Sequence, residues 1–144
     1  MRPGELQLHI GKQTRSFWFD STKRANLAAE LGTTPLAYAQ NADPELFCGY
    51  ALFHSFAGKR SKNFTRLDVV KWFDEPIKYM GEDWEDGRFK NGQEVDKQDL
   101  TIIILYSHAR SKTGVDATLE MERLEIMFGL DDVEDGEDGP LSDG

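Results

Sequence analysis

Among the side chains that could carry nucleophilic, acid–base or metal chemistry, the sequence contains one cysteine and three histidines. The histidines stand singly at positions 9, 54 and 108, and Cys48 has no neighbour at a spacing typical of zinc ligands. A reactive cysteine needs a nearby base, but Cys48 and His54 lie on one helical pattern and point away from each other. We therefore expect Cys48 in the core and His54 as a hydrogen-bonded histidine of a buried helix.

Carboxylate pairs are a second candidate for chemistry, because two neighbouring acids can act as general acid and general base. Asp83 and Glu85 form one such pair, and Glu120 and Glu122 form another. Nothing in the sequence supplies a pocket that would shift their pKa values. We interpret all four as solvated acids and expect that the chain is not an enzyme.

The acidic segments also raise the question of a calcium site. An EF-hand loop requires oxygen ligands at fixed positions, the third among them. In loops that start at Glu82 or Asp131, the third position is Trp84 or Val133, so both fail. Residues 11–14 lack the upstream glycine and the spacing of a phosphate-binding loop. The sequence therefore predicts no metal ion and no cofactor.

One candidate for partner binding lies in the polar segment 81–99. Trp84 and Phe89 are its only large apolar residues, and aromatic rings of this kind dominate the energetics of interfaces. They would anchor a partner if the segment is exposed, or fold back over the core of the same domain. The sequence favours neither alternative.

A second candidate is the basic stretch Lys59, Arg60 and Lys62, which Arg66 continues. Such a stretch would pair with the acidic half of a neighbouring copy or with another protein. A solvated loop is the simpler interpretation.

The elements that would position these residues begin with an N-terminal β-hairpin. Residues 5–10 alternate strictly between polar and apolar side chains, and β-favouring residues follow a short turn at 14–19. Two strands alone are marginal in water, so their apolar face must lie on helices or on another subunit. The pattern predicts an α+β fold, mostly helical, with this hairpin packed on a bundle of about five helices.

Caps and apolar periodicity place most of the helices. The expected ranges are 21–31, 35–40, 45–57, 65–73 and 116–128. The third is apolar nearly all round, which is typical of a central helix, and Gly49 within it indicates a close backbone crossing. Residues 100–106 fit a buried strand or a helix, and we favour a helix capped by Asp96 or Asp99. The last helix has apolar residues at positions 119, 121, 124 and 126–128.

Charge is distributed unevenly along the chain. Residues 1–80 carry 11 Lys/Arg and 8 Asp/Glu, a balance of +3, whereas residues 81–144 carry 6 and 18, a balance of −12. We expect one globular domain over 1–130, with a long acidic loop at 81–99, and a disordered acidic tail at 131–144. Acid of this density repels nucleic acid and anionic lipid, and a single cysteine fits the cytoplasm. No apolar run is long enough for a membrane helix.

Several local patterns resemble the tail assembly chaperones of long-tailed bacteriophages and prophages. The first is the hairpin at 5–19, followed by a helix that ends in Leu31-Gly32. The next is an apolar helix with the pair Gly49-Tyr50. The last is a capped helix that contains Thr65, Asp68, Val69 and Trp72. The resemblance covers residues 5–75, about half of the chain.

The resemblance implies a non-enzymatic protein that binds the tape-measure protein and keeps it soluble while tail tube subunits assemble around it. It also implies self-association, a location in the host cytoplasm, and a second, longer form made by translational frameshifting. The alternative is an acidic inhibitor or DNA-mimic protein that occupies the basic channel of a nucleic-acid enzyme. A small hydrolase is a third hypothesis, and it requires a pocket with a histidine or carboxylate of shifted pKa.

Overall fold

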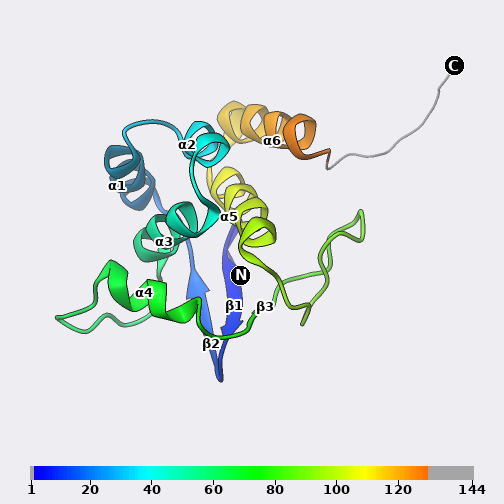
Figure 1. Ribbon diagram of the computed structural model, residues 1–144. Coiled ribbons are helices and arrows are strands. Elements are labelled where there is room, and N and C mark those ends of the chain that lie inside the picture. The colour runs from blue at the N-terminus through cyan, green and yellow to red at the C-terminus, as the bar shows by residue number, and fades with distance from the viewer. Residues whose placement is uncertain (1, 130–144) are drawn as a thin grey trace, which may run out of the picture.

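A three-stranded antiparallel sheet supports the helices in the computed structural model, which describes residues 2–129 (Figure 1). Strands β1 (Leu6–Ile10) and β2 (Gln13–Phe17) form the predicted N-terminal hairpin. A third strand, β3 (Ile77–Tyr79), pairs with the other side of β1, so the strand order is β2-β1-β3. This third strand is not among the elements expected from the sequence.

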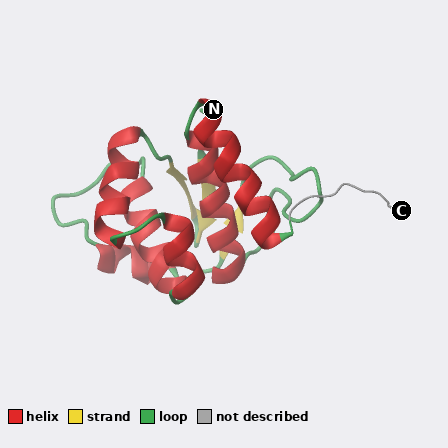
Figure 2. Cartoon of the chain, turned by 90° about the horizontal axis from the view of Figure 1, so that it is seen from above, coloured by secondary structure: helices red, strands yellow, loops and turns green. Residues whose placement is uncertain are grey.

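The alternation along β1 decides which face of the sheet is covered. Leu6, Leu8 and Ile10 are buried, whereas Gln7 and His9 are partly exposed. One face of the sheet therefore joins the core, and the strands are partly hidden behind the helices when the molecule is seen from above (Figure 2).

Six helices lie within the described residues. They are α1 (Ser21–Leu31), α2 (Pro35–Asn41), α3 (Pro44–Ser55), α4 (Arg66–Trp72), α5 (Lys97–Ser111) and α6 (Gly114–Phe128). Polar residues cap the first three helices: the side chains of Asp20, Thr34 and Asp43 each accept a hydrogen bond from a backbone N–H in the first turn. The predicted α+β fold, mostly helical with an N-terminal hairpin, is confirmed.

Helix α5 resolves the ambiguity of residues 100–106 in favour of a helix, capped by Asp96. Nine of its residues are buried, because α3 covers one side and α6 another. Burial on several sides explains a run of β-branched residues that resembles a buried strand in sequence, since packing outweighs intrinsic propensity. No helix among residues 2–129 combines the length and apolarity needed to cross a membrane.

The segment that precedes α5 is a loop of turns and bends held by hydrogen bonds, and the last three residues of the predicted loop, 97–99, belong to α5. Its end runs along the outer edge of β3, where Tyr79 N–H donates to Gln93 O and Val95 N–H donates to Ile77 O. Further along, Trp84 N–H donates to Phe89 O. The predicted tail at 131–144 lies outside the described residues.

The predicted close backbone crossing at Gly49 is wrong. A methyl group built on this glycine would meet only a side-chain methyl of Val70 in α4, at 4.0 Å, which is ordinary van der Waals contact. The small residue is therefore not required by the packing.

We expect Gly49→Ala to raise the free energy of unfolding by about 0.5–1 kcal/mol, because alanine loses less backbone entropy in a helix and fits without strain. Denaturant unfolding of both proteins measures the difference. Gly4→Ala is the contrasting control: its φ is +79° and its new methyl would lie 2.6 Å from Ser107 O, so this variant should be destabilised. A loss of stability in Gly49→Ala would restore the close-crossing interpretation.

Candidate functional site

The two predicted aromatic anchors pack into the body of the protein. The Phe89 side chain is 1% exposed, and its ring meets that of Trp84 edge-on at a centroid distance of 4.8 Å. Trp84 is partly buried, and its ring centroid lies 4.5 Å from that of Tyr106 in α5. Of the two alternatives, folding back over the core is therefore the one observed. An exposed anchor role for Phe89 is wrong, because its ring is enclosed by the core.

One residue of the basic stretch is engaged in contacts within its own domain. The Arg60 guanidinium lies over the rings of Phe53 and Phe64 and donates a 2.6 Å hydrogen bond to Phe53 O, so it covers an aromatic cluster of its own domain. Lys59 and Lys62 are exposed. The loop that carries them lies beside α4, whereas the loop with Trp84 and Phe89 lies at the opposite end of the molecule (Figure 1). The five predicted binding residues therefore do not form one surface.

Cys48 lies in the core, as predicted. Its Sγ is 3.6 Å from Lys97 O and 3.4 Å from Thr101 Oγ1, and burial raises the pKa of the thiol to about 12. The thiol is therefore protonated at neutral pH and is not a nucleophile. His54 forms a hydrogen bond with Glu30 of α1, which also agrees with its prediction.

Glu120 was predicted to be solvated, and this is wrong. Its Oε2 accepts a 2.9 Å hydrogen bond from His108 Nδ1, and its Oε1 accepts a 2.7 Å bond from Lys112 Nζ. Burial alone would raise the pKa of Glu120, but the bonds from His108 and Lys112 hold it below its usual range. The cluster ties α6 to the end of α5. His108 lies in the last turn of α5 and Lys112 is the C-cap residue that follows it, so the approach of Glu120 from the next helix had no local signal in the sequence.

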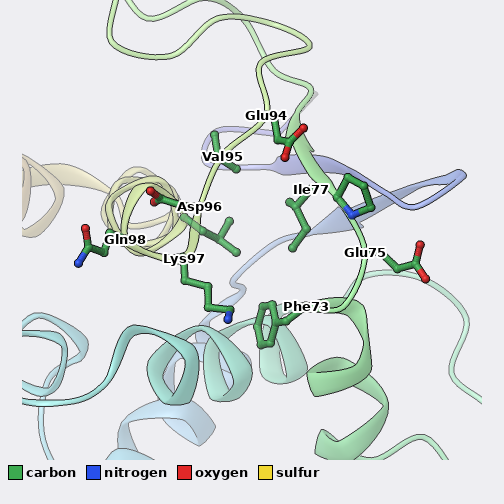
Figure 3. A pocket seen from close by; sticks show the side chains of 10 residues that line it. Phe73, Glu75, Ile77, Glu94, Val95, Asp96, Lys97 and Gln98 are labelled. Carbon is green, nitrogen blue, oxygen red and sulfur yellow. The ribbon is translucent and has the colours of Figure 1, made fainter.

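A hollow of about 350 Å³ opens between the end of α4, β3 and the start of α5 (Figure 3). Phe73, Ile77 and Val95 line it, together with carboxylates such as Glu94. The lining also includes the ammonium group of Lys97, whose Nζ lies 2.8 Å from Glu45 Oε1. The hydrogen bond to Glu45 raises the pKa of Lys97. The lining contains neither histidine nor cysteine. Within residues 2–129, no group of three or more metal-ligating side chains comes together.

The most exposed apolar side chains of the described residues lie mainly on α6. Ile126 is 83% exposed, Val115 is 72% exposed and Leu119 is 46% exposed. Their spacing places them on one face of the helix, with Glu122 between them. We call these four residues the α6 stripe.

The α6 stripe faces away from the core. Leu124, which is buried against the body, lies on the opposite side of the helix from the stripe. Helix α6 is also the outermost element beside α5 and α2 (Figure 1). The apolar positions of this helix are evident in the sequence. A helical wheel would have shown both faces, but not which of them is covered.

The paired state of Glu120 predicts a pH-dependent stability. Since its pKa is lower in the folded protein, its contribution is present above the pKa of the unfolded chain and is lost as pH falls through the folded pKa. We expect Glu120→Gln to lower the free energy of unfolding at pH 7 by about 1–3 kcal/mol. The difference from the unsubstituted protein should shrink in acid.

Denaturant unfolding at a series of pH values measures this effect. Glu122→Gln is the matched control, because Glu122 is exposed on the same helix and should have little influence. Equal effects of the two substitutions at pH 7 would contradict a structural role for the Glu120 cluster.

Comparison of the chain with protein-family models, curated proteins and solved structures finds no match in any of the three. The resemblance to tail assembly chaperones therefore remains a prediction from the residue patterns of 5–75. What the chain does must be inferred from its own surface, where the α6 stripe is the most exposed apolar feature of the described residues.

Proposed function

We propose that this chain is a non-enzymatic, protein-binding chaperone or adaptor of the host cytoplasm. Its specific role would be in bacteriophage tail assembly, where it binds the tape-measure protein. The observation that carries the proposal is the α6 stripe, because exposed apolar side chains gathered on one helix face are typical of a protein-binding surface. The patterns at residues 5–75 supply the link to tail assembly.

The shape of the stripe suits a helical partner. From Val115 to Ile126 the helix extends about 16 Å, or three turns, at 1.5 Å per residue. A partner helix with apolar residues on one side could lay them along this length and remove both surfaces from water. A tape-measure protein, as the resemblance implies, is a long helical chain that aggregates when such surfaces are exposed.

The charge around the stripe supports binding of protein rather than nucleic acid. Asp116 and Glu122 are exposed on α6, and residues 81–144 carry a balance of −12. This acid disfavours contact with phosphate groups and favours a partner with basic residues at the edge of its apolar face.

The alternative, a DNA-mimic inhibitor, would require a continuous face of carboxylates. The α6 stripe interrupts the acid on α6, and this observation favours the chaperone. A hydrolase that uses histidine would require one in its pocket, and the hollow of Figure 3 contains none.

Co-expression with the tape-measure protein of the same phage or prophage tests the proposal. We expect the unsubstituted chain to keep the tape-measure protein in the soluble fraction and to co-purify with it. Ile126→Glu should abolish both effects, because a charge in the stripe would have to be buried in the complex.

Leu67→Glu is the matched control, since Leu67 is 63% exposed on α4 and lies outside the stripe. Thermal unfolding should show that both variants remain folded. If the unsubstituted chain leaves the tape-measure protein insoluble, tail assembly is rejected. If Leu67→Glu abolishes binding and Ile126→Glu does not, the binding surface is not on α6.

A further inference from the structure

The spacing of residues along the α6 stripe is the same in both directions. The steps from Val115 to Leu119, Glu122 and Ile126 are four, three and four residues. Two copies of such a stripe can pair in antiparallel orientation about a twofold axis, because each position then meets its counterpart in the reversed order. Val115 of one copy would lie against Ile126 of the other, and Leu119 against the methylene groups of Glu122, whose carboxylate reaches solvent.

The charges beside the stripe distinguish antiparallel from parallel pairing. Asp116 and Arg123 are both exposed, and their seven-residue spacing places them on the same flank of the stripe. In an antiparallel pair this flank faces itself, so Asp116 of each copy approaches Arg123 of the other. In a parallel pair it would face the opposite flank, which carries Thr118 and Glu125 and offers Asp116 no cation.

We propose that the α6 stripe also binds a second copy of this chain, with the two α6 helices antiparallel and Asp116–Arg123 ion pairs between the copies. The stripe is accessible for this contact because α6 attaches to the body through the opposite side, around Leu124. The proposal uses the surface on which the proposed function rests, so a dimer and a tape-measure complex would exclude each other.

The dimer should be weak. Three apolar side chains along about 16 Å of helix cover less than the roughly 1,200 Å² that stable interfaces bury. Each copy also carries a net charge of −9, which opposes association. In a weak dimer the apolar stripes of two free copies cover each other. A partner that binds more tightly would displace one of the two copies.

Sedimentation velocity of the isolated full chain, from micromolar to millimolar concentration, tests the association. We expect the unsubstituted chain to pass from monomer to dimer, and Ile126→Glu to remain monomeric. Leu67→Glu on α4 is the matched control and should dimerise like the unsubstituted chain. The proposal is overturned if the unsubstituted chain is monomeric throughout, or if Leu67→Glu rather than Ile126→Glu prevents association.

Charge exchange tests the pairing of the flanks. Asp116→Arg and Arg123→Asp alone should each weaken the dimer by about tenfold, because each replaces two attractive contacts with repulsive ones. The double variant should regain the affinity of the unsubstituted chain. Failure of the double variant to recover would reject the Asp116–Arg123 pairs.

Disulfide formation tests the orientation. A mixture of Val115→Cys and Ile126→Cys chains should form a cross-linked dimer of unlike copies, whereas neither variant alone should cross-link efficiently. Cys48 does not interfere, because it is buried. Cross-linking of each variant with itself would indicate a parallel pair and overturn the proposal. All three experiments use the chain without the tape-measure protein, so their failure and the failure of the proposed function are separate outcomes.

Discussion

The enclosure of α5 is the constraint on which the rest of the structure depends. Helices α2, α3 and α6 pack directly against it, and the chain near Gly4, Trp84 and Arg24 reaches it through individual side-chain or backbone contacts. Each fully buried leucine or isoleucine contributes about 1.5–3 kcal/mol relative to an exposed one. A helix with nine buried residues therefore organises the elements around it. Its polar residues are accommodated by specific bonds, such as that between His108 and Glu120.

This arrangement also explains why α6 exposes apolar residues. Helix α6 covers the last side of α5 with Leu124 and is fastened there by Glu120. No element of the described chain lies beyond it, so Val115 and Ile126 on its outer face stay in water. Apolar side chains in this position cost solubility without adding to the core, and this is the physical reason for assigning them to an interaction.

The candidate site was the least predictable part of the protein. The aromatic residues at 84 and 89 suggested anchors because the segment around them is polar, but polarity of the neighbours does not reveal whether a ring finds a place in the core. Phe89 does so beside Trp84 and Tyr79. Conversely, Ile126 looked like a core residue because it is apolar within a helical pattern, and it is the most exposed large apolar side chain of the described residues.

Short-range patterns were sufficient for the hairpin, for the caps at Asp20, Thr34 and Asp43, and for the helical class of the domain. These features depend on alternation and on hydrogen bonds between residues three or fewer apart, which can be identified in a linear sequence. The pairing of β3 with β1, the ion cluster of Glu120 and the outward face of α6 required the folded chain. Each of them depends on which elements of the folded chain meet, and local patterns of residues do not determine that.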